Sequence, residues 1–307
     1  MTALGDSLEE YLRVRRSVGY KLVLPGWLLS DFVAFCDTEH AVSITTDLAL
    51  RWATLPSQAS SGWWRTRLSA VRVFARYLSV IDPATQVPPP DLLPGRTTRV
   101  RPYLFRTADI DALLAAAGAL TPALWAATMR TLIGLLASTG MRVGEALALG
   151  SDDVRLEDGV IRIFHAKGGQ SRDVPLHPST VAALATYALY RDAAEPSAPA
   201  STFLVSRAGG RLTYPAVSTA FAGLRRTIGL VDPGRRNPRL HDLRHHFAVV
   251  TLLDFYASGR DIAPMLPLLS TYLGHVNPAS TYWYLQACPE LMAAAAARLA
   301  MFSAVPS

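Results

Sequence analysis

The feature that most constrains the fold is a proline-rich stretch between residues 83 and 102. It holds three motifs in order: Pro88-Pro89-Pro90, Pro94-Gly95 and the basic run Arg96-Thr-Thr-Arg99-Val-Arg101. Proline lacks a backbone donor and disfavours a helical residue before it, so this stretch predicts an extended tether. A chain of 307 residues is also long for one hydrophobic core. We therefore predict two domains, residues 1–95 and 104–307, joined by a basic linker over 96–103.

The composition is that of a globular protein with an anionic partner. Half of the residues are apolar and 18% are charged, which excludes a disordered chain. The net charge of +6 and the pI of about 9.5 favour nucleic acid as the partner. The two cysteines, Cys36 and Cys288, lie outside any metal-ligand spacing. With no signal-peptide pattern and no uninterrupted apolar span, we expect a cytoplasmic, nucleoid-associated protein without a membrane segment.

The first domain is predicted to be helical. Apolar residues recur with a helical period from Leu8 onward, over 25–37, over 45–55 and most clearly over 62–81. In the last segment, one face carries the apolar residues Trp64, Leu68, Val71, Ala75 and Leu78. The adjacent face carries Arg65, Arg72 and Arg76 without an acidic residue before Asp82. These arginines are either the solvated edge of an amphipathic helix or a row of phosphate contacts.

The second domain is predicted to be mostly helical with one small β element. Gly-Ala-Leu-Thr-Pro at 118–122 predicts a turn between two buried helices. Residues 160–165 and 172–176 are alternating or β-branched runs that flank Ala166-Lys167-Gly168-Gly169-Gln170. This pattern predicts a β-hairpin with Lys167 at its tip. The fold class is therefore mostly α.

Four segments of the second domain carry residues suited to phosphate chemistry. They are Ser138-Thr-Gly140-Met-Arg142-Val-Gly144-Glu145, Lys167, His241-Asp242-Leu243-Arg244, and Leu273-Gly274-His275 followed by Tyr284. Arg142 follows a helix-ending glycine and starts a new helix, where free amides favour an anion. It could equally be a capping residue paired with Glu145, which shares its face. His241 and Arg244 are spaced to share one helical face.

In their order and spacing these segments resemble the tyrosine recombinase (phage integrase) family. The family pattern is an arginine after a threonine-glycine turn, a hairpin lysine, H-x-x-R, L-G-H, and a tyrosine nine residues beyond that histidine. The resemblance covers residues 103–298, and the first domain resembles the family's SAM-like core-binding domain. It implies a DNA recombinase or integrase, of the kind carried by transposons and other mobile elements. It also implies a clamp around double-stranded DNA and a homo-tetramer, with or without partner recombinases, acting on paired sites.

The resemblance also implies the roles of the site residues. Tyr284 is the nucleophile and forms a 3′-phosphotyrosine, so strands are rejoined without ATP. Arg142 and Arg244 offer planar forks to the phosphate oxygens. His241 and His275 donate hydrogen bonds to the phosphate, and His241 takes the tyrosine proton, while Lys167 protonates the 5′-oxygen. No metal and no cofactor is implied.

Some alternatives remain open from the sequence. Tyr282 is a rival nucleophile, although two residues on a helix separate it from Tyr284 by about 200°. His245 and His246 adjoin the H-x-x-R motif, and we assign them to supporting or core positions. A type IB topoisomerase uses a similar residue set, and a noncatalytic DNA-binding accessory protein could keep the scaffold. The amino-acid sequence does not identify the target DNA sequence or any accessory proteins. It also does not distinguish among integration, excision and resolution.

Two surfaces are expected to contact macromolecules. The DNA-contacting arginines are predicted to be Arg65, Arg72, Arg76, Arg96, Arg99, Arg101 and Arg239. Pro289 and Glu290 suit the first turn of a final helix whose apolar face holds Leu291, Ala295, Leu299 and Phe302. Such a helix is marginal alone. It docks in cis on its own domain or, as the resemblance implies, in trans on a neighbouring catalytic domain.

Overall fold

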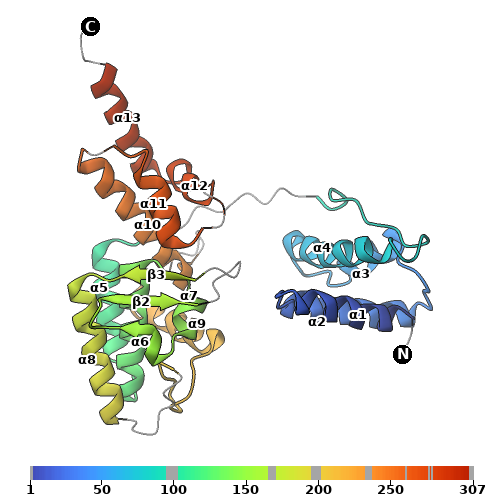
Figure 1. Cartoon of the computed structure of the whole chain (residues 1–307), viewed down its shortest axis with the longest axis horizontal. Helices are drawn as coiled ribbons and strands as arrows, with labels where there is room; N and C mark the ends of the chain where they lie inside the picture. Colours follow the sequence, from blue (N-terminus) through green and yellow to red (C-terminus); the bar gives the residue numbers. More distant parts are fainter. Residues whose placement is uncertain are drawn as a thin grey trace. The chain divides into compact units, whose positions relative to one another are not determined.

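The computed structural model of the chain divides into two compact units, residues 1–99 and 100–307 (Figure 1). The structure describes residues 3–94, 103–164, 171–194, 202–231, 237–259, 261–275, 277 and 279–303. Lys167 at the expected hairpin tip lies outside the described residues, as do Arg96, Arg99 and Arg101 of the expected linker. Each unit has its own hydrophobic core and is described by itself.

The first unit is a small helical bundle. Its helices are α1 (Ala3–Ser17), α2 (Val23–Thr38), α3 (Thr46–Thr54) and α4 (Ser61–Leu78). Two helix starts are fixed by side-chain caps: the Thr45 hydroxyl accepts from the backbone N–H of Leu48, and the Ser60 hydroxyl accepts from that of Trp63. Such caps satisfy donors that the first helical turn leaves free. The helical periodicity of this part of the sequence is thus confirmed to within a few residues.

The core of the first unit combines aliphatic residues with large aromatic side chains. Phe32, Trp52 and Phe74 are fully buried, and Phe32 meets Trp52 edge-on with ring centroids 5.1 Å apart. The buried guanidinium of Arg67 lies 3.8 Å from the Trp52 ring centroid and donates to the Trp52 carbonyl. Because Leu68, Val71, Ala75 and Leu78 of α4 face this core, the helix presents its remaining arginines elsewhere.

The second unit is mainly helical with one small sheet. Its helices are α5 (Thr107–Gly118), α6 (Ala123–Thr139), α7 (Val143–Ala148), α8 (Pro178–Ala194), α9 (Tyr214–Thr227), α10 (Leu240–Ala257), α11 (Met265–Leu273), α12 (Ala279–Ala287) and α13 (Pro289–Ser303), with a 3₁₀ turn over Ser151–Asp153. The predicted turn at 118–122 separates α5 from α6. Across the described residues, no helix has the length and apolar character needed to cross a bilayer.

The sheet is antiparallel and has three strands in the order β1-β2-β3. They are β1 (Val154–Arg155), β2 (Val160–Ile163) and β3 (Arg172–Pro175). The predicted hairpin is the β2–β3 pair, in which Ile163 lies opposite Arg172. The two-residue β1 is an addition that the sequence did not signal. In Figure 1, β3 is the strand next to α11, and the two elements are in contact.

Helix α10 joins two apolar clusters of the second unit. Its first residues, Leu240 and Leu243, belong to the large cluster that α5, α6, α8, α9 and the sheet form. Its later residues, Ala248 and Leu252, belong to a cluster with α11, α12 and the start of α13. Figure 1 shows α10 to α13, in orange to red, gathered at one end of the unit. The H-x-x-R motif therefore lies where the two clusters meet.

The first turn of the final helix, α13, packs on its own chain. Leu291 is fully buried in the second cluster, and α13 contacts α10 and α12 of its own chain. For its first turn the cis alternative is therefore the observed one. The next residue, Met292, is 56% exposed, and docking of the later part of the helix on a neighbouring copy stays a prediction.

Two glycines end helices in the left-handed conformation next to the motif residues. Gly140, with φ of 59°, caps α6, and Gly274, with φ of 67°, caps α11. A residue with a Cβ is strained there. At both positions a Cβ would also overlap a neighbour: Phe247 at 2.5 Å from position 140, and Arg172 at 2.6 Å from position 274. Each glycine thus permits a close approach as well as a turn.

We expect Gly140→Ala to destabilise the chain far more than Gly229→Ala. Gly229 has a similar φ of 70° but open space around its Cβ position, so it isolates the backbone strain of about 1 kcal/mol. At position 140 the overlap with the Phe247 ring adds about 1 to 3 kcal/mol. Urea denaturation of both variants measures the difference. Equal losses would mean that Phe247 moves aside freely.

Candidate active site

The start of α7 holds the first motif arginine. Arg142 is the N-cap residue, and its backbone N–H donates to the Glu145 carboxylate at 2.9 Å. Its guanidinium donates to the same carboxylate at 2.7 Å and to the carbonyl of Gly274. The capping pair and the phosphate-binding alternative are therefore compatible, because the cap fixes the guanidinium beside the Gly274 turn.

Glu145 binds a second arginine from the sheet. Arg172, the first residue of β3, donates to both Glu145 oxygens at 3.0 and 2.7 Å. Its Nε donates to the carbonyl of Tyr272 at 2.9 Å. Burial raises the pKa of the Glu145 carboxyl, but the hydrogen bonds from Arg172 and Arg142 and the charge of Arg172 outweigh it and leave that pKa below its ordinary value. Glu145 is thus an anion that holds two guanidinium groups in place.

Arg244 is buried and ties two turns together. Only 2% of the residue is exposed, and its guanidinium donates to the carbonyls of Gly140 and Leu273, both at 2.8 Å. Burial, aided by the charge of Arg142, lowers its pKa to about 10. The group stays protonated at neutral pH. It therefore brings a permanent positive charge into a dry site, where charge interactions are strong.

His275 follows the Gly274 turn and is neutral. Burial, together with the charges of Arg244, Arg142 and Arg172, lowers the pKa of its imidazole to about 4. Its Nδ1 lies 2.8 Å from the hydroxyl of Thr281, which is 1% exposed. If Thr281 donates this bond, the proton of His275 is on Nε2. The ring can then donate one hydrogen bond to an anion without changing charge.

Tyr284 lies in the same cluster. The residue is 2% exposed, and its ring stacks near His275 with centroids 6.4 Å apart. Its hydroxyl lies 2.9 Å from Nδ1 of His245. Tyr282, two residues earlier, is 47% exposed. The two tyrosines thus differ in burial as their helical spacing predicts, and Tyr284 is the one beside the arginines.

His241 lies on the first turn of α10. It is exposed, and its ring meets that of His245 edge-on with centroids 4.8 Å apart. The structure therefore brings together residues from three of the four motif segments, namely Arg142, Arg244, His241, His275 and Tyr284. Lys167 cannot be placed, since it is outside the described residues.

Two members of the cluster were not anticipated. Arg172 was seen only as part of a strand, although an arginine directly after the hairpin loop was an available signal. His245 was assigned to a supporting or core position, whereas it contacts the hydroxyl of Tyr284. Its spacing of four residues from His241 places both on one helical face, and this was the signal that could have found it.

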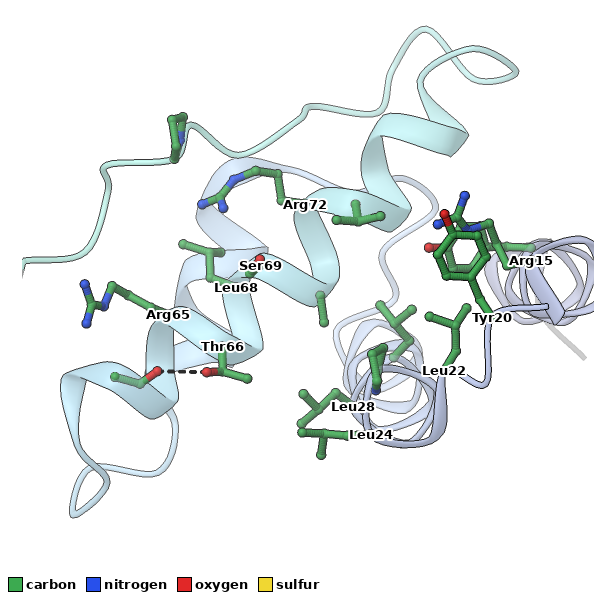
Figure 2. Close-up of a pocket in the computed structure, with 17 residues that line it drawn as sticks. Arg15, Tyr20, Leu22, Leu24, Leu28, Arg65, Thr66, Leu68, Ser69 and Arg72 are labelled. Carbon is green, nitrogen blue, oxygen red and sulfur yellow. Dashed lines mark hydrogen bonds between the residues drawn. The ribbon is translucent and has the colours of Figure 1, made fainter. Parts of the chain in front are cut away.

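Two of the three expected DNA-contacting arginines of the first unit, Arg65 and Arg72, line a groove of about 660 Å³. Figure 2 shows Arg65 and Arg72 on α4 along this groove, with Leu24 and Leu28 of α2 opposite. Arg72 donates to the carbonyls of Pro88 and Pro89 at 2.7 and 2.8 Å. Nε of Arg65 is buried without a hydrogen-bond partner among the described residues. Arg76 is exposed on the same helix.

Arg239 lies in the second unit as the N-cap residue of α10. Its backbone N–H donates to Asp242 at 2.7 Å, and the residue is exposed. The bond anchors the start of the helix that carries His241 and Arg244. Arg239 therefore lies next to the H-x-x-R motif.

Comparison with known proteins assigns the chain to a family. The model of the phage integrase family matches residues 104–290. A relative from Sinorhizobium fredii, described as putative integrase/recombinase y4rB, is 43% identical over 97% of this chain and 98% of its own length. The tyrosine recombinase XerC of Mycobacterium tuberculosis is 30% identical over 92% of this chain and 94% of its own.

The chain belongs to the phage integrase family. The resemblance drawn from the motifs is thus confirmed, and the activity of these tyrosine recombinases is the cleavage and rejoining of DNA. The fold agrees with solved structures. An integrase of transposon Tn1549 in complex with transposon right end DNA has a TM-score of 0.69, at 16% identity, and covers 99% of this chain and 100% of that one. XerH recombinase bound to palindromic difH substrate has a TM-score of 0.67 at 20% identity, with 94% and 83% covered.

In this integrase-family chain we expect Glu145→Gln to cost about 3 kcal/mol of folding free energy. The change removes the charge that Arg142 and Arg172 share, and a buried ion that loses its partner is costly. Folding lowers the pKa of the Glu145 carboxyl, so the carboxylate stabilises the fold at pH values above its ordinary pKa. This contribution is lost as the pH falls through the lowered pKa of the folded protein. The difference in folding free energy between the wild-type protein and the Glu145→Gln variant should therefore become smaller in acid.

Thermal and urea denaturation at neutral pH and in acid measure this difference. The matched control is Asp173→Asn, which removes an exposed partner of Arg162 and should leave the melting temperature unchanged. Equal behaviour of the two variants would show that Glu145 does not stabilise the site.

Proposed function

We propose that this protein cleaves and rejoins DNA strands at specific sites with Tyr284 as its nucleophile. The observation that carries the proposal is the convergence of Arg142, Arg244 and His275 on the Gly274 turn, with Tyr284 buried beside them. The tyrosine oxygen attacks the phosphorus, the bond from phosphorus to the 5′-oxygen breaks, and a 3′-phosphotyrosine forms. Rejoining reverses the step, so no ATP is consumed.

The cluster suits the charge of this reaction. In-line attack places extra negative charge on the nonbridging oxygens, and groups already fixed in a dry site stabilise it most. The two guanidinium groups supply permanent positive charge, and neutral His275 supplies a hydrogen bond. Lys167, by its place in the family pattern, protonates the leaving 5′-oxygen. These groups neutralise the phosphate without a metal ion.

We further propose how the chain holds its substrate. Residues 1–95 act as a core-binding domain, 96–103 as a basic linker and 104–307 as the catalytic domain, with double-stranded DNA gripped by both domains. Arg65, Arg76, Arg239 and the linker arginines contact phosphates, and Arg72 does so after leaving its proline carbonyls. Solved relatives include a lambda integrase tetramer bound to a Holliday junction, which supports a tetramer on paired sites. Such a protein works at the nucleoid, and its relatives support a mobile-element role.

Tyr284→Phe is expected to abolish the covalent protein–DNA adduct while leaving DNA binding intact, because only the hydroxyl is removed. Tyr282→Phe, the matched control, should keep both. A nicked suicide substrate, followed by denaturing gel electrophoresis, traps the adduct. An adduct that survives in the Tyr284 variant and disappears in the Tyr282 variant would reassign the nucleophile. A wild-type protein that binds its site without any adduct would favour the noncatalytic accessory protein.

Arg142→Lys is expected to slow cleavage by about 10²-fold, because lysine keeps the charge but loses the planar fork. Arg162→Lys is the control, since Arg162 is an exposed hairpin arginine paired with Asp173. Single-turnover adduct formation measures both rates, with and without EDTA. Cleavage should be unaffected by EDTA. Strict dependence on magnesium, or normal rates with lysine at position 142, would contradict the mechanism.

A further inference from the structure

His245 occupies a position that the family motif does not explain. Its Nδ1 lies 2.9 Å from the Tyr284 hydroxyl, the atom proposed above to attack the phosphorus. The two rings approach at 63° with centroids 5.4 Å apart. The contact joins α10 to α12 across 39 residues of sequence. It is therefore made by the tertiary structure and not by local geometry.

The chemistry of the pair gives the bond a direction. A phenol has an ordinary pKa near ~10 and an imidazole near ~6.5, so the stable neutral arrangement has the phenol donating to the imidazole. Nδ1 of His245 is then the acceptor, and its ring proton is on Nε2. A phenol is a poor nucleophile at neutral pH until a base takes its proton. The atom in place to do this is Nδ1 of His245.

The ring of His245 is also held in place. His241 meets it edge-on at 4.8 Å, and Trp283 packs against it at 5.8 Å. His245 directly follows Arg244, whose guanidinium is fixed by two carbonyls. A base whose nitrogen lies about 2.6–3.2 Å from the oxygen that carries the proton, on a rigid element, meets the geometric condition for general base catalysis.

His275, the other part-buried histidine of the cluster, is less suited to this task. His275 has a pKa of about 4 because it is buried among three arginines. Its imidazole is a weak base and contacts Thr281 through Nδ1. It serves as a neutral hydrogen-bond donor to the phosphate. The two histidines thus divide the chemistry between them.

We propose that His245 is the general base that accepts the proton of Tyr284 during strand cleavage, an inference that rests on Tyr284 being the nucleophile. The O–H bond of Tyr284 breaks and its proton moves to Nδ1, which makes His245 an imidazolium. The freed oxygen pair forms the bond to phosphorus, and the 5′-oxygen leaves with the electrons of the broken P–O bond and a proton from Lys167. In rejoining, the tyrosine oxygen leaves and regains its proton from His245. This assigns to His245 the role that the family resemblance gave to His241.

The test compares His245→Leu and His245→Asn with the wild-type protein, each carrying either tyrosine or a ring-fluorinated tyrosine at position 284. Fluorine makes the phenol more acidic, so it reduces the need for a base. Single-turnover adduct formation on a nicked duplex is measured at one neutral pH. Gel-shift titration and thermal melting report on DNA binding and folding.

We expect both variants to slow adduct formation by about 10²-fold with DNA binding unchanged. The fluorinated tyrosine should recover about tenfold or more of the lost rate in both, and change the wild-type rate little. The asparagine variant keeps a polar group near the Nδ1 position, so it stays informative if the leucine variant folds poorly. His246→Leu is the control, because His246 packs on Phe105 instead. It should show no recovery with the fluorinated tyrosine.

Three results would overturn the inference. One is wild-type cleavage by His245→Leu. Another is full activity of His245→Asn with ordinary tyrosine, which would make His245 an orienting group only. The last is slow adduct formation by both His245 variants that the fluorinated tyrosine does not accelerate. Failure of the proposed function itself looks different, since the wild-type protein would then give no adduct through Tyr284.

Discussion

The buried guanidinium of Arg244 binds the carbonyls of two turns that are far apart in the chain, Gly140 at the end of α6 and Leu273 at the end of α11. A guanidinium that leaves water must replace its lost hydrogen bonds, and these carbonyls, which helix ends leave without partners, supply them. The same bonds bring the helix starts and turns of the site to one place. Arg142 then reaches Gly274 from one side, and Tyr284 lies beside His275 on the other. The site depends on this one buried charge.

The carboxylate of Glu145 reduces the repulsion between the positive charges of the site. Glu145 binds Arg142 and Arg172, while Arg244 is held by carbonyls alone among its described hydrogen bonds. The cluster therefore carries an excess of positive charge, and this excess adds to burial in lowering the pKa of His275. In the proposed reaction a phosphodiester brings negative charge to this cluster. Under this proposal binding and catalysis use the same excess of positive charge, because the transition state carries more negative charge than the ground state.

Arg172 connects the sheet to this arrangement. It begins β3 immediately after the hairpin loop, binds Glu145, and donates to the carbonyl of Tyr272 next to the Gly274 turn. Gly274 has no Cβ, and a Cβ there would lie 2.6 Å from the Arg172 guanidinium. The glycine of the L-G-H motif is therefore required by packing as well as by its positive φ. In the folded protein the L-G-H motif is thus a turn that contacts strand β3.

The sequence by itself determined the features that depend on neighbouring residues. Helical periodicity and the positions of proline and glycine predicted the helices of the first domain, the turn at 118–122, the β-hairpin and the start of the final helix. Motif spacing selected Arg142, Arg244, His275 and Tyr284. The contact between Glu145 and Arg142 followed from their spacing on one helix. Only the tertiary structure decided that Arg172 reaches Glu145 across 27 residues and that His245 meets Tyr284 across 39. The reason is physical: spacing fixes direction within one helix or strand, but contacts between elements depend on how their buried faces pack.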